Sequence, residues 1–518
     1  NVDKICYNET NYDILYRKEK NMIKKHIPVL VVGLLIVLVA LAGGAVYGIN
    51  KLIPSRKQMD LTEYYGQNAD GEAALILGTE KLEEKALISG EDVYLPLDVV
   101  NGYLNQRYYW DSENKKILYA TPSSLTEEPA SDKADGNVWL KDDTVYLKLD
   151  YVKKYTDIDS YIEQDPARVA IQYKFTNVET VTTKKDTVIR YRGGIKAPIL
   201  SKLAKNTVLR LMNEGEDWDQ VATDDGYIGY IQKKKVSAVD TTDYERDFKT
   251  ESYTYLTMDE PVNLAWHQVT STDANSYFAD AVQNMTGVNV ISPTWFSVTD
   301  NSGNISSLAS GEYVMQAHEK GLKVWGLVDN FNENMSTTEV LSKTSSRQNL
   351  ENQLVNAALQ NGIDGINVDF EQIPTDVGEH YIQFIRELSV LCRVNNLVLS
   401  VDNYVPKGYN THYHREEQGV MADYVIIMGY DEHFAGSYEA GSVASYNYVK
   451  EGIEETLRDV PADKVINAVP FYTRLWNETP KTDEERAEDQ GTEAASYSMK
   501  VTSEALGMEE AAQRVSEA

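Results

Sequence analysis

The sequence predicts a multidomain protein with a single N-terminal transmembrane helix, a small α+β repeat domain, a small β-barrel and a C-terminal (β/α)8 barrel. Three observations support this prediction. The chain has 518 residues, which is too long for one ordinary domain. One apolar run near the N-terminus contains no charged residue. Beyond that run, apolar residues first occur in short runs broken by turns and later in longer runs that alternate with helical patterns.

The chain is strongly acidic. It has 80 Asp and Glu residues against 50 Lys and Arg, which gives a formal net charge of -30. This negative charge repels phosphate backbones, so we expect no nucleic-acid partner. The two cysteines lie in different settings, Cys6 in a polar stretch and Cys392 in an apolar helical pattern. The sequence therefore predicts neither a disulfide framework nor a cysteine metal site.

Residues 27–49 form the apolar run, which has 23 uncharged positions. At about 1.5 Å per residue, a helix of this length crosses a hydrocarbon layer roughly 30 Å thick, so the run predicts a transmembrane helix. Basic residues are more numerous before it than after it. This bias predicts a cytoplasmic tail over residues 1–26, a single pass through the cell membrane and extracellular C-terminal domains. A cleaved signal peptide is the alternative, because small residues cluster at 40–45.

Two similar segments, VYLPLDVVNGYL from Val93 and VYLKLDYVKKYT from Val145, follow one another at an offset of 52 residues. Each is a strand-like run that leads into a helical one, so we expect a duplicated α+β domain over residues 58–175. The polar stretch 121–137 has the composition of a linker or an exposed loop. The repeats resemble the N-terminal domain of copper amine oxidases. Residues 60–175 contain no His or Cys, however, so we expect no metal site there.

Residues 180–238 contain short β-branched runs separated by turns, which is typical of a small β-barrel. The sequence Asp224-Asp225-Gly226 predicts a hairpin turn before the run GYIGYIQ. This pattern resembles a bacterial Src-homology-3-like domain. The resemblance implies either binding to cell-wall peptide or glycan, or a spacer, and both interpretations stay open. We expect residues 238–251, which are polar and charged, to be a linker.

The C-terminal part alternates apolar strand-like runs with helical patterns. Seven such runs occur: PVNLAWHQV, VNVISPTWFSV, LKVWGLVDNF, IDGINVDFEQI, LVLSVDNYV, YVIIMGYDEH and VINAVPFYTRLW. Polar and aromatic residues collect at the C-terminal ends of most runs, where the active sites of TIM barrels are built, so a closed (β/α)8 TIM barrel is favoured over a doubly wound sheet. Because only seven strands precede Ala518, we expect this barrel to be truncated before strand 8.

One strand carries an unusual set of polar residues. Its alternation places Asn367, Asp369 and Glu371 on one face and apolar residues on the other. Buried carboxylates cost several kcal/mol unless they are paired or hydrogen-bonded, so such a column points to chemistry. A solvated edge strand with a polar face is the alternative interpretation.

Three motifs in this region resemble those of family-18 glycoside hydrolases. DGINVDFE is similar to the D-G-x-D-x-D-x-E signature of the family, with Asn367 where the pattern has Asp. Met428 to Asp431 match M-x-Y-D, and residues 469–476 resemble G-x-P-x-Y-G-R-x-W. The resemblance implies a family-18-like TIM barrel over residues 255–518. The sequence DEH at 431–433 resembles the corresponding sequence in the branch of the family that acts on bacterial wall and spore-cortex glycans.

The resemblance implies a catalytic group of three residues. Glu371 would protonate the leaving oxygen, while Asp369 would bind the acetamido N–H and Tyr430 would hold the acetamido oxygen for attack on the anomeric carbon. No metal and no cofactor are needed. The substrate-binding candidates are Asn367, which can orient Asp369, and a set of strand-end residues: Asp431, Trp266, Trp295, Tyr404, Tyr472, Arg474 and Trp476.

The apolar run and the family resemblance together imply a membrane-anchored extracellular glycosidase that cleaves N-acetylglucosamine-containing glycans, either peptidoglycan or a chitin-like polymer. Two alternatives remain. A non-catalytic glycan-binding protein would keep the barrel without turnover, and a surface scaffold would work through the N-terminal modules alone. The oligomeric state does not follow from the sequence.

Overall fold

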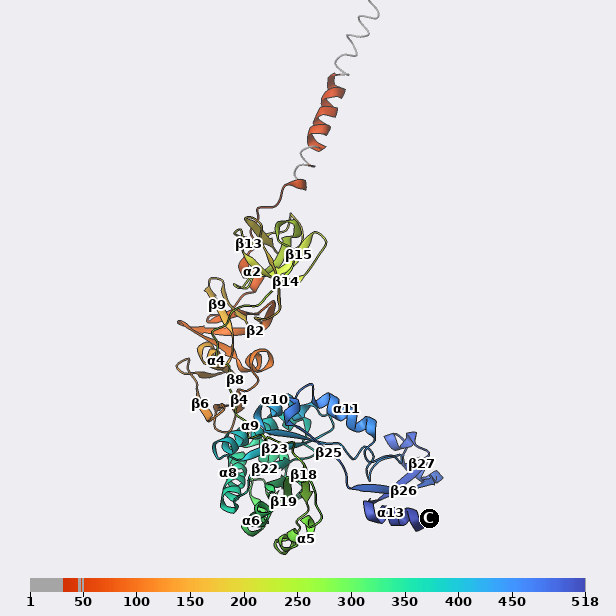
Figure 1. Cartoon of the computed structure of the whole chain (residues 1–518). Coiled ribbons are helices and arrows are strands. Elements are labelled where there is room, and N and C mark those ends of the chain that lie inside the picture. Colours follow the sequence, from red (N-terminus) through yellow and green to blue (C-terminus); the bar gives the residue numbers. More distant parts are fainter. Residues whose placement is uncertain (1–30, 45–47, 49–50, 518) are drawn as a thin grey trace, which may run out of the picture. The chain divides into compact units, whose positions relative to one another are not determined.

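The computed structural model describes residues 31–44, 48 and 51–517 (Figure 1). These divide into two compact units. Unit 1 comprises the described residues up to Pro96 together with Thr156–Phe248, and unit 2 comprises Leu97–Tyr155 and the chain from Lys249 onward. The predicted repeat domain, 58–175, is therefore divided between the two units.

The predicted transmembrane segment requires a correction. Residues 31–44 are helical, while 27–30, 45–47 and 49–50 of the predicted span lie outside the described residues, as does the predicted tail at 1–26. In the part of the chain that the structure describes, no helix has both the length and the apolar character needed to cross a membrane. This finding contradicts the predicted single-pass anchor and the membrane localisation that we drew from it.

Unit 1 contains a sheet with the order β3-β2-β1-β10-β9 and, in the region of the predicted β-barrel, a second, antiparallel sheet with the order β13-β12-β16-β15-β14-β11-β17. The first sheet follows α2 (Leu61–Tyr65) and consists of β1 (Glu72–Leu77), β2 (Glu80–Ser89), β3 (Asp92–Pro96), β9 (Asp159–Gln164) and β10 (Ala167–Gln172). The second consists of β11 (Val178–Thr182), β12 (Thr187–Arg190), β13 (Ile199–Leu203), β14 (Val208–Asn213), β15 (Trp218–Ala222), β16 (Ile228–Gln232) and β17 (Asp240–Thr242).

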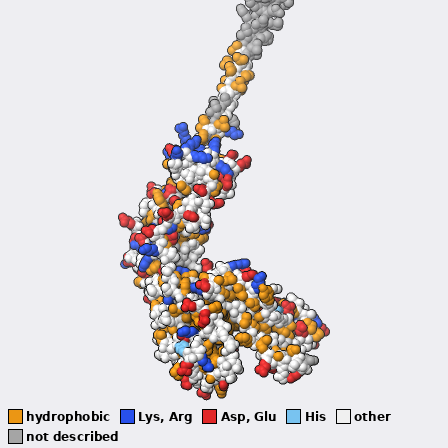
Figure 2. All heavy atoms as spheres, in the orientation of Figure 1, with side chains coloured by type: hydrophobic (Ala, Val, Ile, Leu, Met, Phe, Trp, Pro, Cys, Tyr) orange, Lys and Arg blue, Asp and Glu red, His pale blue; other side chains and the backbone are white. Residues whose placement is uncertain are grey.

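The predicted hairpin of the second sheet is confirmed. Strands β15 and β16 pair antiparallel, and Gly226 between them has a φ of +89°, a conformation that glycine adopts without steric cost. Residues 180–238 carry 11 basic and 7 acidic side chains. Figure 2 shows Lys and Arg side chains gathered at the end of unit 1 where β13 lies. The overall acidity of the chain therefore does not extend to this region. Its Src-homology-3-like identity stays a prediction.

The second repeat belongs to unit 2. After α3 (Leu97–Val99) and a π-helical turn, η1 (Val100–Leu104), the chain forms β4 (Tyr109–Asp111), β5 (Lys116–Ala120), β6 (Leu125–Ser131), β7 (Val138–Lys141), β8 (Thr144–Lys148) and α4 (Leu149–Tyr155). Both repeats do run from a strand into a helical segment, as predicted. The stretch 121–137 is not simply a linker, because β6 within it pairs antiparallel with β5 and parallel with β7.

The C-terminal part of unit 2 is a parallel sheet in sequence order, and its strands coincide with the seven predicted runs. They are β18 (Leu264–His267), β19 (Val290–Val298), β21 (Lys323–Asp329), β22 (Gly365–Asp369), β23 (Val398–Tyr404), β24 (Tyr424–Met428) and β25 (Val465–Ala468). A short strand, β20 (Ile305–Ser307), pairs antiparallel with β19. The helices between them are α5 (Phe278–Val282), α6 (Gly311–Glu319), α7 (Thr337–Ser342), α8 (Thr344–Asn361), α9 (Gly378–Val394), α10 (Arg415–Met421) and α11 (Tyr446–Thr456).

A closed eight-stranded barrel is not what the described residues form. The sheet runs from β18 at one end to β25 at the other, and within residues 51–517 no pairing joins these two strands. The last predicted run divides after β25. Its second half is β26 (Tyr472–Pro480), which pairs antiparallel with β27 (Met499–Gly507) as a separate hairpin, followed by α13 (Met508–Glu517). The short helix α12 (Asp483–Glu488) lies in the connection.

Apolar side chains fill both faces of the parallel sheet. On the outer face, Ile366 and Val368 belong to the same buried cluster as Leu354 of α8 and Phe384 of α9. On the other face, Trp325 of β21 stacks on Tyr424 of β24, with ring centroids 5.3 Å apart. Two strands lie between β21 and β24 in the sheet, so this contact spans the concave side of a curved sheet. On the concave side, the polar side chains nearer the C-terminal ends of the strands therefore lie next to an apolar layer that contains Trp325 and Tyr424.

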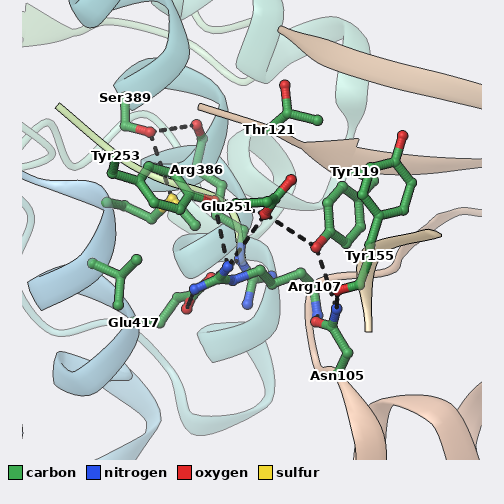
Figure 3. A network of polar contacts seen from close by, with 12 residues as sticks. Asn105, Arg107, Tyr119, Thr121, Tyr155, Glu251, Tyr253, Arg386, Ser389 and Glu417 are labelled. Carbon is green, nitrogen blue, oxygen red and sulfur yellow. Dashed lines mark hydrogen bonds and ion pairs between the residues drawn. The ribbon is translucent and has the colours of Figure 1, made fainter. Parts of the chain in front are cut away.

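The segment 97–155 is attached to the helices of this sheet by a network of polar contacts (Figure 3). Arg107 Nε and Nη2 donate to Oε1 and Oε2 of Glu417 in α10, with N···O distances of 2.8 and 3.0 Å. Glu417 also accepts a hydrogen bond from Arg386 of α9 at 2.8 Å. A second contact joins the Tyr109 hydroxyl to His380 Nδ1 at 2.7 Å. Both contacts lie inside unit 2, so this segment is part of the same folded body as the parallel sheet.

Candidate active site

The polar column predicted on β22 points to the concave side of the sheet. The intervening side chains, Ile366, Val368 and Phe370, lie in the outer core cluster, so the predicted alternation is confirmed. The strand ends at Asp369, and Glu371 follows two residues later. Gly365 begins the strand, and a Cβ there would lie 2.8 Å from the Trp325 ring. Because the Trp325 ring approaches the backbone this closely, the strand starts with glycine.

Asn367 is the centre of a buried hydrogen-bond network. Its side chain is fully buried, and its Oδ1 accepts hydrogen bonds from Trp266 Nε1 at 2.9 Å and from Ser292 Oγ at 3.1 Å. Its Nδ2 donates to Asp402 Oδ1 at 2.8 Å. The amide therefore ties β18, β19, β22 and β23 together. An amide suits this position because it accepts and donates at the same time, which an ionised carboxylate cannot do.

Asn330 holds the backbone of Glu371. Its Oδ1 accepts from the Glu371 amide at 2.9 Å, and its Nδ2 donates to the Glu371 carbonyl at 2.9 Å. The same Nδ2 also donates to Thr337 Oγ1 at 2.9 Å. These bonds fix a residue that lies beyond the end of β22 and has no ladder hydrogen bonds of its own.

The Glu371 side chain is held as well. The Tyr404 hydroxyl, at the end of β23, donates to Glu371 Oε2 at 2.6 Å. This is the short distance of a hydrogen bond to a carboxylate. Burial raises the pKa of Tyr404, and the neighbouring Glu371 carboxylate raises it further, so the phenol stays protonated and available as a donor.

Asp369 lies next to other acids. Burial raises its pKa from 3.8 to about 7, and the charges of Glu371 and Asp329 add to the effect. Asp369 Oδ1 is buried and has no hydrogen-bond partner among the residues that the structure describes. The carboxyl therefore changes its charge near neutral pH, which a freely solvated aspartate does not do.

Tyr430 follows β24 and faces the same group of acids. Burial raises the pKa of its hydroxyl, and the charges of Asp402, Asp369 and Glu371 raise it further. Its ring lies edge-on to Trp266 and to Tyr472, with centroid separations of 6.5 and 6.4 Å. The three rings line part of a cavity of about 310 Å³. The Tyr472 hydroxyl in turn donates to Asp431 Oδ1 at 2.6 Å.

Three of the predicted sugar-binding residues make their hydrogen bonds outside this group. Trp295 is 1 % exposed, packs edge-on against Tyr313 in the outer core and donates its N–H to Asn275, so it offers no face to a sugar. Arg474 and Trp476 lie on β26. Arg474 donates to Ser503 on β27, and Trp476 donates to the Gly441 carbonyl. The structure brings together the other eight predicted residues through the contacts described above.

Sequence reasoning missed four residues of the site: Asn330, Asp329, Ser292 and Asp402. A signal for three of them is present in the sequence, because the strand ends Val328-Asp329-Asn330-Phe331 and Val401-Asp402-Asn403-Tyr404 repeat the pattern Val-Asp-Asn-aromatic on both sides of β22. Within the described chain, no group of three or more His, Cys, Asp or Glu side chains is arranged to hold a metal ion.

The sequence is similar to known bacterial glycosylases. It is 28% identical over 206 residues to the uncharacterized glycosylase YvbX of Bacillus subtilis, an alignment that covers 37% of this chain and 59% of that protein. It is 28% identical over 145 residues to the cortical fragment-lytic enzyme of the same organism, which covers 26% and 33% of the two chains. The chain thus spans between a third and three fifths of the length of these relatives.

Two solved structures are also similar to part of this chain. A chitinase from Chromobacterium violaceum matches with a TM-score of 0.40 at 18% identity, over 49% of this chain and 75% of that one. The spore cortex-lytic enzyme SleL from Bacillus megaterium matches with a TM-score of 0.38 at 17% identity, over 49% and 57%. The decisive match is to a family: residues 226–515, more than half of the 518 residues, match the glycosyl hydrolases family 18. The chain therefore belongs to the family 18 glycosyl hydrolases.

Proposed function

We propose that this chain hydrolyses N-acetylated glycans, either peptidoglycan or a chitin-like polymer, with retention at the anomeric carbon. The observation that carries the proposal is the grouping of Asp369, Glu371 and Tyr430 at one end of the parallel sheet, where the charges of both acids act on the Tyr430 hydroxyl. Family membership supports the reaction class. The names of the relatives, a cortical fragment-lytic enzyme and chitinases, support the substrate class.

In the first step, the acetamido oxygen of the sugar attacks the anomeric carbon. The glycosidic C–O bond breaks, and Glu371 gives its proton to the leaving oxygen. Ionised Asp369 accepts a hydrogen bond from the acetamido N–H and stabilises the positive charge of the cyclic intermediate, while the Tyr430 hydroxyl holds the acetamido group in line. In the second step, water attacks the anomeric carbon as Glu371 takes up its proton, and the acetamido group is restored.

The surrounding residues support these roles. Asn330 and Tyr404 fix the backbone and the side chain of Glu371, so the acid is already placed before substrate binds. The aromatic rings of Trp266 and Tyr472 flank Tyr430 in the cavity and offer apolar surface for a sugar ring.

The test is the release of reducing ends from an N-acetylated glycan by the full chain and by Glu371→Gln. Glutamine has the shape of glutamate but cannot donate the proton, so we expect the variant to lose nearly all activity. If both proteins release reducing ends equally, Glu371 is not the acid. If neither does so on any N-acetylated glycan while both bind it, the chain is a glycan-binding protein.

A further inference from the structure

Three neighbouring strands carry an aspartate at the same level of the sheet. Asp329 on β21 lies opposite Asp369 on β22. In the register of β22 and β23, Val368 lies opposite Val401, so the next pair along these parallel strands is Asp369 and Asp402. Side chains at one level of neighbouring strands point to the same face. With Glu371 added, four carboxyl groups meet here, and like charges at such spacing cannot all be ionised.

Asp402 is the member of this group that is least able to carry a charge. Its side chain is 2 % exposed, and its Oδ1 accepts a hydrogen bond from the neutral amide of Asn367. Its Oδ2 is buried without a hydrogen-bond partner in the described part of the chain. Burial holds the pKa of Asp402 well above the ordinary range, and the charge of Asp369 raises it further. A carboxyl that keeps its proton at this position needs an acceptor for its O–H.

Asp369 needs a hydrogen-bond donor instead of an acceptor. When it ionises, its buried Oδ1 requires a donor, and among the described residues none donates a hydrogen bond to that atom. Asn367 Nδ2 donates to Asp402, and in the described residues it forms no hydrogen bond to Asp369 Oδ1. The unpaired acceptor of Asp369 and the unpaired oxygen of Asp402 are thus complementary. Catalytic hydrogen bonds are often long without substrate and tighten when it binds.

We propose that Asp402 is a positioning residue that keeps a proton on Oδ2 and donates it as a hydrogen bond to Asp369, with Asn367 orienting the donor. The inference rests on the proposed function and adds a residue to it. Other titratable groups act on the same pair: Glu371 beside Asp369, Asp329 on the neighbouring strand, and the hydroxyls of Tyr430 and Tyr381. In the described residues neither these four nor Asp402 forms a hydrogen bond to Asp369 Oδ1. Of the five, Asp402 and Tyr381 have a buried polar atom without a partner, and Asp402 lies level with Asp369 on the adjacent strand.

Two substitutions of Asp402 test whether it acts as a protonated donor, as a charged group or as a purely structural group. Asp402→Asn keeps the shape, accepts from Asn367 and can donate its N–H to Asp369, so we expect its kcat to stay within about threefold of the wild type. Asp402→Ala removes the donor. It should move the acid limb of the kcat profile up by about one pH unit, the size of effect that follows from losing one charge-assisted hydrogen bond. KM should change little.

Ser400→Ala is the matched control. Ser400 lies on the same strand and face, and its Oγ is buried without a partner among the described residues, but it carries no exchangeable charge. Its pH profile should be that of the wild type. Infrared difference spectra provide a readout that does not depend on activity: at pH 7 the wild type should show the C=O band of a buried protonated carboxyl that Asp402→Asn lacks.

The outcomes are distinct. An Asp402→Asn protein that folds but loses activity, an Asp402→Ala protein with an unshifted profile, or the absence of the infrared band each overturns the inference while leaving the proposed function in place. A wild type that hydrolyses no N-acetylated glycan overturns both. If Asp402→Ala does not fold, the Asn variant and the infrared band decide the question alone.

Discussion

Asn330 binds both backbone groups of Glu371, its Oδ1 accepting from the amide and its Nδ2 donating to the carbonyl, each at 2.9 Å. A residue at the end of β21 thereby fixes the position of the proposed acid just beyond the end of β22. The Glu371 side chain is therefore aimed by the neighbouring strand as well as by its own.

Substitution of Asn330 should lower activity without unfolding the protein. Asn330→Asp keeps the acceptor for the Glu371 amide, but it cannot donate to the Glu371 carbonyl. Because a shift of about 1 Å at a catalytic group costs on the order of a hundredfold, we expect kcat to fall roughly tenfold to a hundredfold with little change in KM. Steady-state kinetics measure the effect. Asn334→Asp, which adds the same charge at an exposed position nearby, should behave as the wild type.

Removal of the Tyr404 hydroxyl tests how the Glu371 side chain is held. Tyr404→Phe deletes the donor that lies 2.6 Å from Glu371 Oε2 and keeps the ring. We expect kcat to fall about tenfold, because one hydrogen bond to a charged group contributes ~1.5 kcal/mol. A KM that rises while kcat stays constant would instead identify Tyr404 as a platform for a sugar ring, the role that the sequence suggested.

Asp369 should make the stability of unit 2 depend on pH. Its folded pKa of about 7 lies above the ordinary value of 3.8, so the folded state binds the proton more tightly than the unfolded state. The resulting stabilisation is complete below about pH 4 and is lost as the pH rises to 7. Asp369→Asn, which cannot ionise, should be more stable than the wild type at pH 8 by on the order of 1 kcal/mol or more, although it should be nearly inactive. Urea denaturation at pH 5 and pH 8 measures the difference; a variant less stable at pH 8 contradicts this account.

The contact between segment 97–155 and the catalytic part of unit 2 should depend on Glu417. Its side chain is 4% exposed and pairs with both Arg107 and Arg386. Glu417→Ala leaves a buried, uncompensated guanidinium on Arg386, so we expect the free energy of unfolding to fall by about 3–5 kcal/mol. Lys116→Ala is the control. It breaks an ion pair whose acid, Glu127, is 46% exposed, and it should cost less than about 1 kcal/mol. Equal losses would mean that Glu417 does not anchor the segment.

The strands of the C-terminal half were predictable because their apolar runs are long and are separated by helical patterns. The alternation around Asn367 also placed three polar residues on one face, as the structure has them. The closure of the barrel was not predictable, because the final run contains two strands that diverge, β25 and β26. The hydrophobicity of an apolar run does not show that the run divides into two strands. The predicted single-pass anchor was wrong, since in the described part of the chain no helix has both the length and the apolar character to cross a membrane.

The site was predictable where it lies on one strand and less so where it depends on neighbouring strands. Trp295 was predicted to bind a sugar because it lies near the end of a predicted strand, but strand alternation turns its side chain to the outer core. Asn330 and Asp402 gain their roles only from the register of β21 and β23 with β22, which is a three-dimensional property. Their shared Val-Asp-Asn-aromatic pattern was the available signal.

The central claim is that Glu371 and the acetamido group of the substrate act together. It is tested most directly with two samples of one glycan, fully N-acetylated and chemically de-N-acetylated, each treated with the wild type and with Glu371→Gln. We predict reducing-end release only from the acetylated glycan, lowered by roughly a hundredfold to ten-thousandfold in the variant. Equal release from both glycans, or a variant as active as the wild type, would contradict the account.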